Sequence, residues 1–175
     1  MKKINIKQMA IYSIVAALYV ALTLTLSFMA FNVIQFRIAE ALVLLCFFNK
    51  KYSIPMILGC FIANLFSPFG WPDIVFGTLA TAIAVIGVMY SKNLIVASIF
   101  PVLSNALIVG LELTFVINGV FTWEVFGLNA LFVAIGEIGT VSIVGVVLFK
   151  FLSRNEKFLE LIDANQNINK EKKTV

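Results

Sequence analysis

The sequence contains no histidine and only two cysteines, and charged residues make up 13% of its 175 residues. Without histidine, the chain cannot form a Ser-His-Asp or Cys-His catalytic unit or a histidine-ligated metal site. It has no phosphate-binding loop of the form GxxxxGK followed by Ser or Thr, so it is not itself the ATPase of a pump. Cys46 and Cys60 lie in apolar segments outside any CxxC motif, which indicates buried, inert thiols. We therefore expect neither a metal site nor a cofactor.

Apolar residues dominate the chain instead, at 61% of the sequence, including 17 phenylalanines. A soluble domain has about 45–50% apolar and 25% charged residues. The first apolar run is too long for the core of a cleavable signal peptide and lacks a convincing cleavage site, so we read it as a transmembrane helix. The sequence predicts an all-α integral membrane protein with six transmembrane helices. Their approximate ranges are 9–28, 33–48, 53–66, 74–90, 94–117 and 126–152.

The positions of the basic residues predict how these helices are oriented. Twelve of the thirteen lysines and arginines lie before residue 9, in the short connections 49–51 and 91–93, or after Phe149. Cytoplasmic loops carry such an excess of basic residues, so both termini are predicted to be cytoplasmic. The net charge of +4 then reflects orientation, and we expect no nucleic-acid partner. We predict a membrane domain at 1–152 and a polar, partly disordered cytoplasmic tail at 153–175, in a multi-pass protein of the plasma membrane.

The one remaining basic residue, Arg37, lies near the start of the second apolar segment, three residues before Glu40. On a helix these two side chains share a face and can pair. An ionised group at the centre of a bilayer costs about 2.5–3.5 kcal/mol on insertion scales, so such groups face protein, water or a ligand. Two interpretations follow: the pair locks two helices together, or it borders a binding cavity.

The acidic residues that orientation does not explain fall in the outer half of the predicted bundle. Asp73 could cap the helix that begins at Ile74 or could contact a ligand, and Trp71 could be a residue of the interfacial aromatic belt. Glu112 and Glu137 have no basic residue inside the membrane to pair with except Arg37, so at least one of them needs water, a proton or a ligand. The predicted polar pocket, open to the outside, comprises Arg37, Glu40, Asn64, Trp71, Asp73, Asn105, Glu112 and Glu137.

Three small residues in the first segment, Ser13, Ala17 and Ala21, repeat at a spacing of four. This spacing places them in one file along the helix, where another helix can approach closely.

Three stretches of the chain resemble the QueT family: QFRIAEAL at 35–42, LGCFIANL at 58–65 and DIVFGTLAT at 73–81. The resemblance covers about residues 5–155. These proteins are substrate-binding (S) components of energy-coupling factor (ECF) transporters and are associated with uptake of queuosine precursors such as pre-queuosine-1, a 7-aminomethyl deazaguanine. The resemblance implies partnership with a transmembrane coupling subunit and two ATPase subunits. It also implies that Ala17 and Ala21 form the Ala-x-x-x-Ala motif that docks the coupling subunit.

The function expected from this resemblance is capture of a deazaguanine from outside the cell for ATP-driven uptake, without enzymatic activity. Two alternatives remain open. The chain could be an autonomous proton-coupled transporter in which Glu112 or Glu137 carries the proton. It could also be an intramembrane enzyme that uses paired carboxylates as acid and base.

Overall fold

A computed structural model describes residues 6–31 and 34–164, and all regular secondary structure in these ranges is helical. Within these ranges, four helical stretches are long and apolar enough to cross a membrane. The first is α1 (Ile6–Thr25), and the second joins η3 (Asp73–Gly77) to α5 (Thr78–Tyr90). The third is α6 (Leu94–Asn118), and the fourth joins α7 (Trp123–Glu137), η4 (Ile138–Gly145) and α8 (Val146–Leu152). The prediction of an all-helical protein is confirmed for the described residues.

The other two predicted crossings are shorter than a bilayer requires. The first joins η1 (Ile38–Leu44), a 3₁₀-helix, to α3 (Leu45–Phe48), and after η2 (Lys50–Tyr52) comes the second, α4 (Ser53–Asn64). A 3₁₀-helix rises about 2.0 Å per residue and an α-helix about 1.5 Å, so each stretch is roughly 20 Å long, against a hydrocarbon core of about 30 Å. The count of six crossings and the side of each terminus therefore stay predictions.

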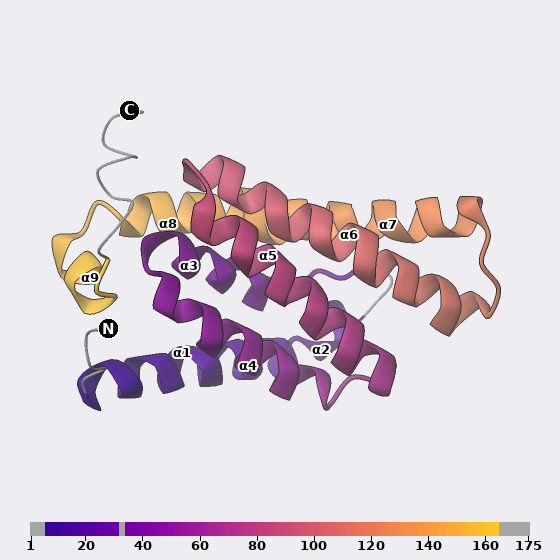
Figure 1. Ribbon diagram of the computed structural model, residues 1–175, viewed down its shortest axis with the longest axis horizontal. Helices are drawn as coiled ribbons and strands as arrows, with labels where there is room; N and C mark the ends of the chain where they lie inside the picture. Colours follow the sequence, from indigo (N-terminus) through magenta and orange to yellow (C-terminus); the bar gives the residue numbers. More distant parts are fainter. Residues whose placement is uncertain (1–5, 32–33, 165–175) are drawn as a thin grey trace.

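Three pairs of helices pack most closely. α6 lies against both α5 and α7, and α1 lies against α4 (Figure 1). At Gly110 of α6, an added Cβ would lie 2.8 Å from the Cα of Ala130 in α7, so the lack of a side chain lets the two backbones approach. A large apolar core is built from buried side chains of α1, η1, α3, η2, α4, α5, α6, η4 and α8. Its biggest side chains include Phe47, Phe48, Tyr52, Met56 and Phe149.

The connections rich in basic residues gather at one end of the bundle. The α3–α4 connection and the α5–α6 connection lie at the same end as the start of α1 and the end of α8 (Figure 1). The opposite end carries the connections α4–α5 and α6–α7, and the α6–α7 hairpin extends beyond its neighbours there. This separation is the arrangement on which the orientation prediction depends.

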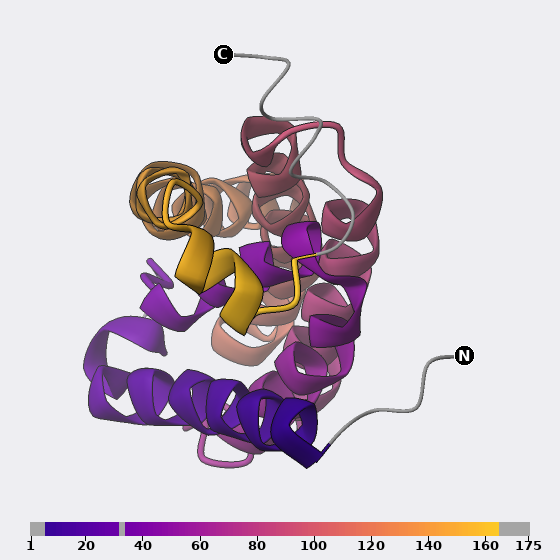
Figure 2. The same cartoon turned by 90° about the vertical axis from the view of Figure 1, so that its left-hand side faces the viewer.

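A short helix, α9 (Glu156–Leu161), lies across the basic end of the bundle (Figure 2). The segment after it is held by side chains from elsewhere in the chain: Asn49 Nδ2 donates to the carbonyls of Ile162 at 3.1 Å and Asp163 at 3.0 Å. Gln8 Nε2 in α1 donates to Asp163 Oδ2 at 2.9 Å. The first part of the predicted polar tail is thus attached to the helical body. The rest, 165–175, lies outside the described residues, and the predicted boundary at 152/153 stays a prediction.

Candidate functional site

Arg37 is buried, but it does not pair with Glu40 as the sequence suggested. Its backbone is not helical, because residues 35–37 have no regular secondary structure and η1 begins only at Ile38. The two residues therefore do not share a helical face. Arg37 Nη2 lies instead 3.8 Å from Asp73 Oδ2, and its guanidinium lies over the ring of Phe31, with Cζ 5.3 Å from the ring centroid. The predicted Arg37–Glu40 pair is thus replaced by a pair with Asp73.

Asp73 is the first residue of η3, and its side chain is fully buried. Neither of its carboxylate oxygens has a hydrogen-bond partner among the described residues, so the helix-cap interpretation is wrong, and its carboxylate faces Arg37. Asn64, at the end of α4, donates from Nδ2 to the Asp73 carbonyl at 3.0 Å. A Cβ at Gly77 would lie 2.8 Å from both Asn64 Nδ2 and Asp73 Oδ1, so only glycine leaves room for this arrangement. Asn64, Asp73 and Arg37 form one buried polar group.

Glu40 is buried in η1 and is engaged by two hydroxyl groups. Tyr19 of α1 donates its hydroxyl to Glu40 Oε1, and Thr81 Oγ1 of α5 donates to the same oxygen at 3.2 Å. Neither Tyr19 nor Thr81 was predicted to belong to the site. A tyrosine in an apolar helix looks like core in the sequence, and only the fold brings it to the carboxylate.

Glu137, the last residue of α7, is also buried, and it accepts a hydrogen bond from Asn105 Nδ2 of α6 at 2.8 Å. Asn105 and Glu112, seven residues apart on α6, both face the interior, as their spacing predicted. Within the part of the chain that the structure describes, Glu137 forms no ion pair.

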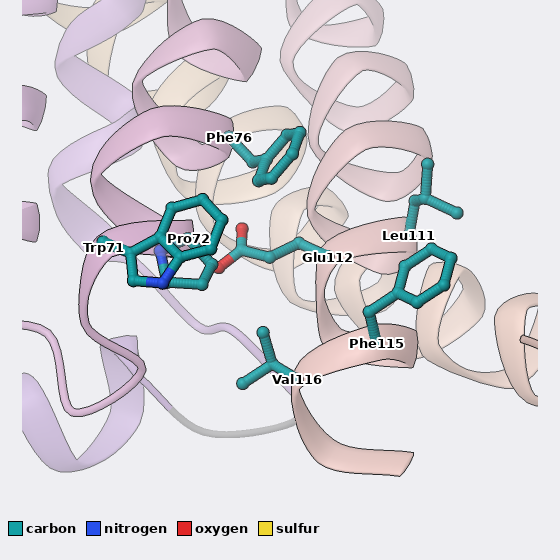
Figure 3. A pocket seen from close by; sticks show the side chains of 7 residues that line it. All are labelled: Trp71, Pro72, Phe76, Leu111, Glu112, Phe115 and Val116. Carbon is teal, nitrogen blue, oxygen red and sulfur yellow. The ribbon is translucent and has the colours of Figure 1, made fainter. Parts of the chain in front are cut away.

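Glu112 differs from the other buried acids, because among the described residues its carboxylate has neither a hydrogen-bond partner nor an ion pair. Its side chain lines a cavity of about 370 Å³ between the start of η3 and the last turns of α6 (Figure 3). The carboxylate points toward Trp71 and Pro72, and the ring of Phe76 lies beside it. Glu112 is only 3% exposed, while Trp71 is 70% exposed. The cavity walls are completed by Leu111, Phe115 and Val116.

The eight predicted site residues thus fall into two groups. Trp71 and Glu112 line the cavity, and the other six are buried polar side chains close to it or deeper in the bundle. The aromatic and apolar wall residues were missed, because phenylalanine and leucine in an apolar helix carry no signal that distinguishes a cavity wall from a lipid-facing surface.

Three of the four buried acids lie on or next to helical segments that are not α-helical. Glu40 is in the 3₁₀-helix η1, Asp73 begins the π-helical η3, and Glu137 directly precedes the π-helical η4. π-Helical turns are rare and occur often at functional sites, because the wider turn reorients side chains relative to the regular helix. These irregular segments direct acids from three different stretches into one interior.

The buried polar side chains of the site carry more negative than positive formal charge. Among the described residues, four buried carboxylates (Glu40, Asp73, Glu112 and Glu137) share the interior with one buried guanidinium, that of Arg37. A buried charge is expensive unless it is paired and hydrogen-bonded. The arrangement is therefore suited to a ligand that brings hydrogen-bond donors or positive charge.

A family model described as QueT transporter matches residues 9–154. The chain is also similar to a protein named Queuosine precursor transporter QueT from Lactococcus lactis subsp. cremoris (strain MG1363), with 46% identity over 85 residues. This alignment covers 47% of the chain and 50% of the relative, so it spans half of that protein's length. No solved structure matches the chain.

Proposed function

Because the chain belongs to the QueT transporter family, we propose that it captures a queuosine precursor from outside the cell, as the substrate-binding (S) subunit of an ECF-type importer. The family is one of transporters, so the chain is not an enzyme, and the intramembrane-enzyme alternative is dropped. Its several membrane-spanning helices and its family make it a multi-pass membrane protein. Location in the plasma membrane is part of the proposal.

The observation that carries the ligand assignment is the cavity lined by Glu112 beside the buried Arg37–Asp73 pair. A deazaguanine offers adjacent ring N–H and exocyclic NH₂ donors that one of the four buried carboxylates can accept in a bidentate pair. Its carbonyl oxygen requires a donor, and Arg37 Nε has no partner among the described residues. Its flat ring suits aromatic walls such as Phe76 and Phe115. The site thus offers a complement to each feature of the ligand.

The proposed direction of capture depends on the placement of the cavity. Residues 71–76 precede α5 and residues 111–116 end α6, so the cavity lies at the end of the bundle opposite the basic connections. If those connections are cytoplasmic, as the positive-inside rule predicts, the cavity opens to the outside. In this arrangement the two short apolar stretches, 38–48 and 53–64, complete six crossings within the bundle.

The proposed partners are a transmembrane coupling subunit and two ATPase subunits. The predicted docking residues Ser13, Ala17 and Ala21 are all exposed on α1, while Tyr19 and Thr23 of the same helix face the interior. A file of exposed small side chains allows a partner helix to approach closely. The lack of a phosphate-binding loop in this chain agrees with ATP hydrolysis by separate subunits.

Reconstitution tests this function. The chain is placed in proteoliposomes alone and together with a coupling subunit and its two ATPases, and entry of radiolabelled 7-aminomethyl-7-deazaguanine is followed. We expect uptake only with the complete complex and only with ATP. Uptake by the chain alone, driven by a proton gradient, would establish the autonomous transporter instead. Calorimetry on the purified chain measures ligand binding independently of transport.

A further inference from the structure

The four buried carboxylates of this interior are not equivalent in what surrounds them. Asp73 lies beside Arg37, Glu40 accepts hydrogen bonds from Tyr19 and Thr81, and Glu137 accepts one from Asn105. Glu112 has no hydrogen-bonding partner on either oxygen among the residues that the structure describes. Three of the acids therefore interact with other side chains of the protein. Glu112 does not, so its carboxylate is available to a ligand that enters the cavity.

The other residues that line the cavity restrict which chemical group of the ligand can lie beside Glu112. Of the seven lining residues, the other six carry no charge, and the indole N–H of Trp71 is their one side-chain hydrogen-bond donor. The pyrimidinone ring of a deazaguanine presents two acceptors, its carbonyl oxygen and its unprotonated ring nitrogen, and the single indole N–H of Trp71 cannot satisfy both. Arg37 and Asn64, outside the cavity lining, are better suited to that ring.

A positively charged substituent fits the cavity on two counts. An ammonium group is a donor without an acceptor, so it leaves no polar atom unsatisfied against the apolar walls. It compensates the charge of Glu112, and the faces of Trp71, Phe76 and Phe115 attract a cation as well. A neutral substituent would leave the buried carboxylate uncompensated.

We infer that Glu112 is the specificity-determining residue that reads the positive charge of the ligand's side arm, so that the site selects a cationic 7-aminomethyl deazaguanine over the neutral 7-cyano compound. This inference rests on the proposed function, since it assigns a role within the same binding site. The rest of the ring is held by other groups and contributes equally to both compounds.

The test is a set of calorimetric titrations on the purified full-length chain, with two ligands and three variants. The ligands are 7-aminomethyl-7-deazaguanine and 7-cyano-7-deazaguanine, which differ in the charge of one substituent. The central variant is Glu112→Gln, which keeps the shape of the side chain and removes its charge. Glu137→Gln removes a buried charge outside the cavity lining, and Glu124→Gln makes the same change at an exposed residue at the start of α7.

We expect the wild type to bind the aminomethyl compound at least tenfold more tightly. Glu112→Gln should weaken binding of the aminomethyl compound by roughly ten- to a hundredfold, the range for loss of a charge-assisted hydrogen bond. Its affinity for the cyano compound should stay within about twofold of wild type or improve. Neither Glu137→Gln nor Glu124→Gln should change the ratio of the two affinities.

Equal weakening of both compounds by Glu112→Gln would overturn the inference, because Glu112 would then be reading the shared ring. Unchanged binding of both would overturn it too. If neither compound binds the wild type, the proposed function fails first. Thermal unfolding without ligand guards against misfolding: Glu112→Gln should be as stable as wild type or more so, since no protein hydrogen bond to this carboxylate is lost.

Discussion

Replacing Gly136 by alanine is expected to disturb the candidate site through the backbone rather than through any polar group. Gly136 lies in α7 directly before Glu137, and an added Cβ would lie 2.6 Å from the carbonyl oxygen of Gln35 and 2.9 Å from its carbonyl carbon. Ordinary contact begins near 3.4 Å, so the Gln35 backbone must move by about 0.8 Å. The same carbonyl accepts the backbone N–H of Arg37 at 3.0 Å, so the shift is passed to Arg37.

The magnitude follows from two opposing effects. Overpacking a close contact costs about 1–3 kcal/mol. Alanine in place of glycine within a helix stabilises the folded state by up to about 1 kcal/mol, because alanine has the higher helix propensity. We therefore expect a net loss of about 1–2 kcal/mol, which lowers the unfolding midpoint by roughly 2–8 °C on the scale of soluble domains of this size. Because Arg37 is displaced, affinity for the aminomethyl deazaguanine should fall by about tenfold or more, the cost of weakening one charge-assisted hydrogen bond.

Gly127 provides the matched control, because it lies on the same helix and an added Cβ there meets nothing within 4 Å. Gly127→Ala should leave ligand affinity unchanged and should raise stability slightly through helix propensity. Both variants are measured by thermal unfolding in detergent and by calorimetric titration. Equal midpoints and equal affinities for Gly136→Ala and Gly127→Ala would show that the approach of α7 to Gln35 does not position Arg37.

Three further predictions concern orientation, docking and the buried ion pair. A cysteine introduced at Lys50 should react with an impermeant thiol reagent only from the cytoplasmic side, and one at Gly119 only from outside; the reverse pattern would invert the topology. Ala17→Trp should leave ligand binding within about twofold of wild type yet abolish uptake by the reconstituted complex, since a bulky side chain blocks close approach of a helix. Asp73→Asn should destabilise the chain by about 3–5 kcal/mol, because it leaves Arg37 buried without its counter-charge. Combined with Arg37→Gln, the same change should cost less, and a larger loss in the double variant would argue against the pair.

Two features of the chain supply controls for these experiments. The native Cys46 and Cys60 are both buried, so background labelling should be low. Leu18 is exposed on α1 beside the file of small residues but outside it, so Leu18→Trp tests whether any bulky group on this helix blocks uptake. Normal uptake with Ala17→Trp in the complex would remove α1 from the proposed docking surface.

The helical class and the burial of the polar site residues were predictable, because both follow from composition and from the cost of placing charge in an apolar surrounding. Asn105 and Glu112 face the interior as their spacing of seven predicted. Which of these polar side chains pair with one another was less predictable. Arg37 pairs with Asp73 rather than Glu40 because Arg37 lies before the start of the 3₁₀-helix η1, so the helical three-residue spacing does not apply to this pair.

The π-helical segments are a second feature that could not be predicted from the sequence. A pattern of apolar residues indicates a helix but does not reveal where one turn widens, and both η3 and η4 lie within otherwise regular helices. The lengths of the second and third apolar stretches were also overestimated, since apolar residues flank both 38–48 and 53–64 without continuing the helix. The cavity walls depend on contacts between η3 and α6, which no local pattern encodes.

The segment after α9 is attached to α1, so the two ends of the described chain lie next to each other. Gln8, near the start of α1, and Asp163, after α9, are joined by a hydrogen bond of 2.9 Å, so two positions 155 residues apart in sequence are neighbours in space. A circular permutant that links these regions and opens the chain in the α6–α7 connection would preserve every helix. New termini would then lie at the end of the bundle that carries the cavity, where a reporter attached to them would sense ligand entry from close by.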